Sequence, residues 1–360
     1  MITRTPIPEE MPAQADPLAP LRAYLGPDDA RVARVMAPLR ECYVGSQRDD
    51  AVAQEIRRLI ANSLLPRDPR RPASIGNRCD GSGFVVIGAS GSGKSRALHE
   101  ALVRHPAFPG YGVPESGCPL VRVHARSPCT LGQLGTAILH AIGYPTRRAL
   151  KENEAWHRVS QQLPPYGVLF LLIEDIHNVL RQKNVDEIKK VADTLRSLMI
   201  FPEWPVQLLL TATEEFVAFA GADRQFSRRL KYVPFENVHP AEDGEWIERA
   251  VTDFAGSAGL KLSFAEEDMM IPRLCRAAAF QMGLVFEILL DAVEVAIRAR
   301  RRTLAIGDFS EAYSTRVTER DLNMFLSPTW FDIDPTLVRR RGEKTEEGLP
   351  PAPRAPRRSR

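Results

Sequence analysis

The chain has 360 residues, of which 44% are hydrophobic and 26% are charged, and its formal net charge is +3. This ordinary globular composition allows one large domain or two, and the charge balance neither demands nor excludes nucleic acid as a partner. The five cysteines lack metal-site spacing, no run approaches the roughly 20 apolar residues of a membrane span, and the N-terminus lacks a signal-peptide core, so we expect a cytoplasmic protein with free thiols and no membrane partner.

The first part of the chain, residues 1–40, is predicted to be an N-terminal arm. Residues 1–20 are rich in Pro and Ala and are expected to be flexible, whereas residues 21–40 have the apolar spacing of a helix. A further helix is expected over residues 49–64. Val44 lies in the connection between these helices, which is a common place for an adenine pocket when a phosphate-binding motif follows. Plain packing explains the same pattern equally well.

The most informative stretch is Gly81–Ser95, which has the sequence GSGFVVIGASGSGKS. It contains the pattern G-x-x-x-x-G-K-[ST] after an apolar run, Phe84–Ile87, and a helical pattern follows. This order is typical of a strand, a phosphate-binding loop and a helix, in which backbone N–H groups converge on phosphate oxygens. Lys94 is expected to reach the β and γ phosphates of ATP, and the Ser95 hydroxyl to bind Mg²⁺. The residues expected to bind the nucleotide are Gly88, Ala89, Ser90, Gly91, Ser92, Gly93, Lys94, Ser95, Arg96 and Val44.

Apolar runs alternate with helical patterns as far as residue 235. The strands predicted after the phosphate loop are Leu120–His124, Val168–Ile173, Val206–Thr213 and Tyr232–Phe235. The helices predicted between them cover residues 131–142, 151–163 and 185–199. This alternation predicts an α/β fold with a doubly wound parallel sheet over residues 41–238, and such sheets bind ligands at the carboxyl ends of their strands.

From residue 242 onward the pattern is purely helical. The predicted helices cover residues 246–254, 266–279 and 283–300, and one more begins at residue 306. We therefore expect a smaller, all-α C-terminal lid domain over residues 239–330. Residues 331–360 become rich in Arg and Pro and are expected to form a disordered tail.

An acidic pair, Glu174 and Asp175, directly follows the apolar run that ends at Ile173. An enzyme with a phosphate loop needs acidic groups about one strand away, which hold Mg²⁺ through its water shell and polarise the attacking water. By position, Glu174 would serve the magnesium ion together with Ser95, and Asp175 would act as the general base.

These motifs together resemble those of AAA+ ATPases. The resemblance rests on the phosphate loop, the acidic pair followed by Ile-His-Asn, the polar end of the strand near residue 213 and the arginine pair before residue 230. Over about residues 40–330 the chain is similar to the TniB/TnsC-type ATP-binding proteins of DNA transposition modules. The resemblance implies an AAA+ P-loop NTPase fold, ATP and Mg²⁺ as cofactors, and subunits that assemble as a filament or ring on duplex DNA. It also implies a transposase and a target-selection protein as partners.

By the same resemblance, Thr211 or Thr213 would be the polar sensor beside the γ-phosphate, although a threonine that merely caps the strand is the alternative. Arg229, ahead of Arg228, would reach the ATP of a neighbouring subunit and make hydrolysis depend on assembly. Ordinary surface charge is the alternative for both arginines.

Two departures from the family pattern predict slow hydrolysis. Relatives usually have Asp and then Glu in the acidic pair, whereas this chain has Glu174 and then Asp175. Each carboxylate is therefore displaced by a methylene, and misplacing a catalytic group by ~1 Å can cost on the order of 10²-fold in rate. In addition, Phe286 stands where the lid of many AAA+ proteins carries the arginine of a Gly-x-x-Arg pattern, which here begins at Gly283.

Arg126, Thr130 and Lys183 are the candidates for contacts with duplex DNA. Contacts with backbone phosphates give salt-sensitive affinity that carries no sequence information. For Lys183 a solvated helix face is the favoured interpretation, and contact with DNA is the alternative. Two other functions also fit the sequence: a nucleotide-gated scaffold that binds ATP with little hydrolysis, and a signalling or origin-recognition type ATPase outside transposition.

Overall fold

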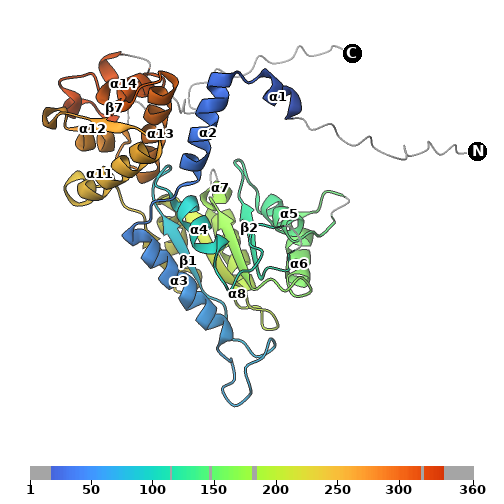
Figure 1. Ribbon diagram of the computed structural model, residues 1–360. Coiled ribbons are helices and arrows are strands. Elements are labelled where there is room, and N and C mark those ends of the chain that lie inside the picture. The colour runs from blue at the N-terminus through green and yellow to red at the C-terminus, as the bar shows by residue number, and fades with distance from the viewer. Residues whose placement is uncertain (1–17, 114–115, 146–147, 181–184, 318–319, 336–360) are drawn as a thin grey trace, which may run out of the picture. The chain divides into compact units, whose positions relative to one another are not determined.

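The computed structural model describes residues 18–113, 116–145, 148–180, 185–317 and 320–335 (Figure 1). The strands are β1 (Gly83–Ile87), β2 (Leu120–His124), β3 (Phe170–Glu174), β4 (Gln207–Ala212), β5 (Leu230–Pro234), β6 (Lys261–Ser263) and β7 (Thr303–Ala305). The α-helices are α1 (Ala19–Tyr24), α2 (Pro27–Glu41), α3 (Gln47–Leu64), α4 (Lys94–Val103), α5 (Leu131–Ala141), α6 (Glu152–Gln162), α7 (His177–Leu180), α8 (Val185–Met199), α9 (Glu215–Ala222), α10 (Arg224–Ser227), α11 (Pro240–Ser257), α12 (Met270–Ala277), α13 (Met282–Arg298) and α14 (Ile306–Ser314). The short 3₁₀ turns are η1 (Glu266–Asp268), η2 (Arg320–Leu322) and η3 (Trp330–Asp332).

Five strands form one parallel sheet in the order β2-β3-β4-β1-β5. The central strand β1 pairs with β4 and β5, so that Gly83 is level with Leu208 on one side and with Leu230 on the other. Helices connect the successive strands, which confirms the predicted doubly wound parallel sheet. Because all five strands run in the same direction, the segments that follow β1, β3 and β4 meet at one edge of the sheet.

The central strands β3, β4 and β1 are buried on both faces, and successive side chains along them alternate between two cores. Leu172 and Leu209 belong to the core that also contains side chains of α3 and α4. Leu171 and Leu210 belong to the core that also contains side chains of α5 and α8. By this alternation Glu174, at the end of β3, shares the face of Leu172, which is the face covered by the helix that follows the phosphate loop.

The start of α5 is fixed by a capping box. Thr130 Oγ1 accepts a hydrogen bond from the Gln133 N–H at 3.1 Å, and the Gln133 side chain accepts one from the Thr130 N–H at 2.8 Å. Both bonds satisfy N–H groups that have no partner inside the helix. Thr130 is therefore the N-cap of α5.

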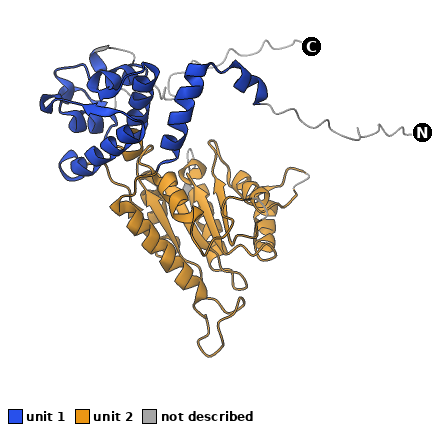
Figure 2. Ribbon diagram, in the orientation of Figure 1, with its two compact units in different colours: residues 1–42, 239–280, 285–360 blue, residues 43–238, 281–284 orange. Residues whose placement is uncertain are grey.

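The chain divides into two compact units (Figure 2). One unit contains residues 43–238 and 281–284, and the other contains residues 1–42, 239–280 and 285–360.

In the unit of residues 1–42, 239–280 and 285–360 (blue in Figure 2), α2 is joined to α13 by ion pairs. Arg298 pairs with Asp29 at 2.7 Å, and Arg40 pairs with Glu294 at 2.7 Å. The sequence predicted only an N-terminal arm for this segment. It did not indicate that α2 belongs to the same unit as the C-terminal helices, because ion pairs between distant segments leave no local pattern.

The unit of residues 1–42, 239–280 and 285–360 also contains a short parallel ladder, in which Leu262 of β6 is level with Leu304 of β7. Strands of this length are too short to give a recognisable alternating pattern. The helix expected over residues 266–279 is divided at Met269, which has a φ of +47°. No helix in the described part of the chain combines the length and the apolar content needed to cross a membrane.

We predict that Leu209→Ala in β4 lowers the free energy of unfolding by about 2–5 kcal/mol, because it leaves a cavity in a packed core. Leu209 is 1% exposed, whereas Leu64 at the end of α3 is 68% exposed. Leu64→Ala is the matched control and should change the free energy by less than about 0.5 kcal/mol. Urea denaturation measures both, and equal losses would contradict this account of the core.

Candidate functional site

The segment between β1 and α4 forms a tight loop at the carboxyl end of β1. Gly91 and Gly93 have φ values of +82° and +93°, a left-handed conformation that glycine adopts at little cost. Gly93 immediately precedes the first residue of α4. The strand, the glycine turn and the helix N-terminus therefore have the arrangement that directs backbone N–H groups at an anion.

Lys94 opens α4 and is buried against the loop, with 7% of its surface exposed. Its Nζ donates to the carbonyl oxygens of Gly88 and Ala89, at 2.8 Å each. A buried ammonium group must find acceptors, and the loop backbone supplies them. These bonds fix the cation beside the loop backbone.

The loop is packed closely from two directions. A Cβ atom on Gly88 would lie 2.6 Å from the Phe235 carbonyl oxygen, just after β5, and one on Gly283 would lie 2.5 Å from the Gly91 carbonyl oxygen. Gly283 belongs to the first turn of α13 and to the same compact unit as the loop. Larger side chains at either glycine would therefore displace the loop backbone.

Phe286, which stands in place of a lid arginine, is part of an aromatic cluster. Its ring centroid lies 5.7 Å from that of Trp246 and 5.7 Å from that of Phe254. The pair with Trp246 is edge-to-face and the pair with Phe254 is tilted, and such aromatic contacts stabilise helices against each other. Phe286 therefore packs against other aromatic side chains of its own unit.

Glu174 is the last residue of β3 and is 2% exposed. Its Oε2 accepts a hydrogen bond from Nε of Arg122, on the neighbouring strand β2, at 2.6 Å. Its Oε1 is buried and has no hydrogen-bond partner among the described residues. Burial lowers the pKa of Arg122, but the hydrogen bond and the charge of Glu174 outweigh this and raise that pKa. One oxygen of Glu174 is therefore held by Arg122, and the other has no partner among the described residues.

Asp175 begins the turn after β3 and has a φ of +52°, a conformation that Asp tolerates better than most residues. Its N–H donates to Thr211 Oγ1 at 2.9 Å. One carboxylate oxygen lies 3.6 Å from Nδ1 of His124, at the end of β2. The structure thus places the Asp175 carboxylate at the carboxyl edge of the sheet, next to an imidazole.

The two threonines differ in what their hydroxyl groups do. Thr211 is fully buried and accepts the hydrogen bond from the Asp175 backbone. The Thr213 hydroxyl is buried and has no hydrogen-bond partner among the described residues. Thr211 is therefore bound to the protein backbone, whereas Thr213 offers an uncommitted polar group at the end of β4.

The two arginines before β5 also differ. Arg229 Nη2 pairs with Asp80 Oδ2 at 2.9 Å, and the Arg229 side chain is 20% exposed. Arg228 is exposed, and no ion pair is found for it in the described part of the chain. Arg229 is therefore held by an ion pair within the chain, whereas Arg228 is exposed. The assignment of either arginine to a contact with another subunit stays a prediction.

Val44 lies just before α3 and is half-buried. In the same region the Arg48 guanidinium lies 5.9 Å from the centroid of the Phe235 ring. Arg48 Nη1 is buried without a described hydrogen-bond partner. Because Phe235 also lies against the phosphate loop at Gly88, Arg48 and Phe235 belong to the surroundings of the loop.

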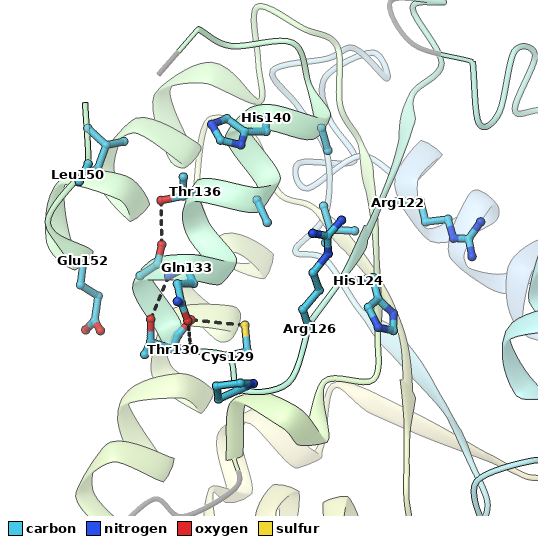
Figure 3. A pocket seen from close by; sticks show the side chains of 16 residues that line it. Arg122, His124, Arg126, Cys129, Thr130, Gln133, Thr136, His140, Leu150 and Glu152 are labelled. Atoms are coloured by element: carbon cyan, nitrogen blue, oxygen red, sulfur yellow. Dashed lines mark hydrogen bonds between the residues drawn. The ribbon is translucent and has the colours of Figure 1, made fainter. Parts of the chain in front are cut away.

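A hollow of about 990 Å³ lies beside β2 and α5 (Figure 3). Arg126 and Thr130 line it, and the Arg126 side chain runs back along β2 into this space. Arg122 and His124 of β2 are also among its lining residues. Lys183 lies outside the described residues.

Residues 75–239 match the family model described as Bacterial TniB protein. This segment is similar to the TniB family and is called the TniB domain below. It contains the phosphate loop, the acidic pair, both threonines and both arginines, so the resemblance to TniB is confirmed where the sequence motifs lie.

Solved structures show the fold around this TniB domain. The ORC1 protein of Aeropyrum pernix in complex with DNA matches with a TM-score of 0.53 and 17% identity, over 78% of this chain and 68% of that chain. Cdc6p of Pyrobaculum aerophilum matches with a TM-score of 0.51 and 15% identity, over 78% and 70%. At such low identity these matches show the fold alone, which is the AAA+ P-loop fold expected from the sequence. The comparison with curated proteins gives no match.

The residues of the TniB domain fit a nucleoside triphosphate with Mg²⁺. The loop offers N–H groups and the Lys94 cation for phosphate, and Mg²⁺ prefers oxygen ligands. Ser95 supplies a hydroxyl at the second position of α4, and Glu174 Oε1 is a buried carboxylate oxygen without a partner.

Sequence reasoning missed Arg122 and His124, which contact the two members of the acidic pair. The signal was present, because Arg122 is a charge inside a short apolar strand and lies two residues from His124. The pairing itself depends on β2 lying next to β3, with His124 level with Glu174. The register of β2 on β3 depends on contacts between distant segments, so it cannot be predicted from the local sequence.

We predict that substitutions of the two threonines affect different properties, stability for Thr211 and phosphate release for Thr213. Thr211→Val leaves the Asp175 N–H without an acceptor and should lower the free energy of unfolding by about 1–3 kcal/mol. Thr213→Val removes a hydroxyl that has no partner and should leave stability nearly unchanged. If Thr213 contacts the phosphates, its loss should reduce phosphate release by about 10²-fold. Denaturation and phosphate-release assays on both variants test this, and a reversed pattern would refute the assignment.

Proposed function

We propose that this protein is an ATPase that binds ATP with Mg²⁺ in its TniB domain, oligomerises on duplex DNA in that form, and recruits or activates a transposase. The observation that carries the proposal is the phosphate loop with its buried Lys94, at the same sheet edge as Glu174 and Asp175. A target-selection protein is the further partner that the TniB family implies.

Each residue at this edge has a role in the proposal. Lys94 and the N–H groups of Gly88–Ser95 bind the β and γ phosphates, with Arg96 and Val44 near the nucleotide. Ser95 and Glu174 hold the magnesium ion, which when bound neutralises phosphate charge. Asp175 orients the attacking water and takes its proton, and Thr213 senses the γ-phosphate.

Hydrolysis is proposed to be slow and to act as a release signal. The order Glu174-Asp175 displaces both carboxylates relative to relatives, and Phe286 offers no cation to the phosphates. A scaffold that binds ATP with little hydrolysis is the second candidate, favoured by the same two features.

The DNA contacts are proposed to involve Arg126 and Thr130, at the loop after β2. Arg126 is exposed and has no ion pair in the described part of the chain. Thr130 uses its hydroxyl as the acceptor of the helix cap, which leaves the hydroxyl proton for a phosphate oxygen. Lys183 remains a candidate from sequence alone. Such contacts predict an affinity that falls steeply as salt rises.

The test of the proposed function is Lys94→Ala. The loss of the ammonium group should abolish ATP binding, and with it ATP-dependent assembly on duplex DNA, measured by light scattering with a non-hydrolysable ATP analogue. Lys231→Ala, which removes an exposed lysine from β5, is the control and should assemble as the wild type does.

Assembly by Lys94→Ala equal to that of the wild type would refute the proposal. Phosphate release with DNA and transposase then separates the two candidates. Stimulated release supports the ATPase, and release that stays at background supports the scaffold.

We predict that Arg228→Ala leaves the free energy of unfolding within about 0.5 kcal/mol of the wild type but lowers assembly-dependent phosphate release on the order of 10³-fold. Arg229→Ala should instead lower the free energy of unfolding by about 1–2 kcal/mol, because Asp80 loses a charged partner. Mixing each variant with a chain carrying Lys94→Ala shows whether the arginine acts across subunits. Loss of activity confined to Arg229→Ala, without loss of stability, would contradict this prediction.

A further inference from the structure

An unexpected charge lies next to the carboxylate that is proposed to serve the magnesium ion. Arg122 is in the middle of β2, an edge strand of the main sheet. Its Nε donates to Glu174 Oε2 at 2.6 Å, and the exposed fractions of the two side chains are 42% and 3%. The pair joins an accessible cation to a buried anion.

The burial of Glu174 does not by itself explain why only one of its two carboxylate oxygens is hydrogen-bonded. A guanidinium group can bond both oxygens of a carboxylate at once, and a buried carboxylate is most stable when both oxygens have donors. Here only Oε2 is bonded, and Oε1 has no hydrogen-bond partner in the described part of the chain. One oxygen is held and the other is kept available.

The neighbouring phenol does not compete as a second charge. Tyr111 is 6% exposed, and burial raises its pKa to about 12, against a lowering by Arg122. Tyr111 is therefore neutral near pH 7. Arg122 is the group that balances the charge of Glu174 on this face of the sheet.

The length of the glutamate side chain makes an anchor useful. Glu has one more rotatable bond than Asp, so its carboxylate can occupy more positions, and each position lost on binding a cation costs conformational entropy. A hydrogen bond to one oxygen restricts the carboxylate before the cation arrives. Partners that orient metal-ligating carboxylates in this way contribute 10–100-fold to metal affinity, as an order of magnitude.

We propose that Arg122 is a positioning residue for the cation of the nucleotide site: it holds Oε2 of Glu174 and thereby presents Oε1 to the hydrated Mg²⁺. This inference rests on the proposed function, because it assumes that nucleotide and Mg²⁺ bind together at the phosphate loop. It assigns to β2 a role in the site that the sequence motifs do not indicate.

The test measures binding of a fluorescent ATP analogue to the full chain as a function of Mg²⁺ concentration, with EDTA as the metal-free reference. In Arg122→Ala the half-saturating Mg²⁺ concentration should rise about tenfold, while the affinity in EDTA stays within about twofold of the wild type. Arg122→Lys keeps the charge but loses the planar fork, so its Mg²⁺ requirement should be intermediate. Arg104→Ala, which removes an exposed arginine at the end of α4, is the control and should match the wild type.

A second variant separates positioning from a merely structural role. Glu174→Asp shortens the carboxylate, so it no longer reaches Arg122 in the same way. Adding Arg122→Ala to Glu174→Asp should therefore change the Mg²⁺ requirement much less than Arg122→Ala does alone. A structural pair would show such coupling in thermal stability but not in the Mg²⁺ requirement.

An unchanged or lower Mg²⁺ requirement in both Arg122 variants would overturn the inference, and a lower one would mean that Arg122 competes with the cation. If Arg122→Ala does not fold, Arg122→Lys and the cycle with Glu174→Asp decide in the same way. If the wild-type chain itself binds no nucleotide, the proposed function fails and this inference fails with it. If the wild type binds the nucleotide in a Mg²⁺-dependent manner and the Arg122 variants leave this dependence unchanged, the inference about Arg122 is wrong and the proposed function stands.

Discussion

Parallel pairing of β3, β4 and β1 is the constraint on which the site depends. It brings the segments after these strands to one edge of the sheet, so that residues more than a hundred positions apart in sequence become neighbours. The Asp175 N–H bonds to Thr211, and the Gly88 N–H bonds to the Ala212 carbonyl oxygen at 3.3 Å. These bonds join the acidic turn to the end of β4, and the end of β4 to the phosphate loop.

The site also shows how a folded chain keeps charges in a largely buried place. Lys94 is satisfied by the carbonyl oxygens of its own loop, and Glu174 is satisfied by Arg122 through one oxygen. The Lys94 ammonium group can exchange the loop carbonyl oxygens for phosphate oxygens. The Oε1 atom of Glu174 is available to a cation because it has no partner among the described residues. A buried carboxylate with only one oxygen hydrogen-bonded is costly, which is why Glu174 indicates function here.

Much of this arrangement was predictable from sequence because the signals are local. The pattern that ends at Lys94 and Ser95 specifies a strand, a glycine turn and a helix, and the apolar run before Glu174 specifies a buried strand. The TniB resemblance then followed from the same motifs. Even the cap at Thr130 could be predicted, since its partner lies three residues away.

The rest depends on contacts between distant segments, which leave little trace in a single sequence. The partners of the acidic pair, Arg122 and His124, are set by the register of β2 on β3. The ion pair that holds Arg229 depends on Asp80, which lies far earlier in the chain. The strands β6 and β7 are too short to produce a pattern of their own.

The most direct measurement of the central claim is a calorimetric titration of the full chain with a non-hydrolysable ATP analogue and with AMP, both in the presence of Mg²⁺. If the loop closing at Lys94 holds the β and γ phosphates, the triphosphate analogue should bind in a saturable manner and much more tightly than AMP. Equal affinity for the two ligands, or no binding of either, would contradict the account.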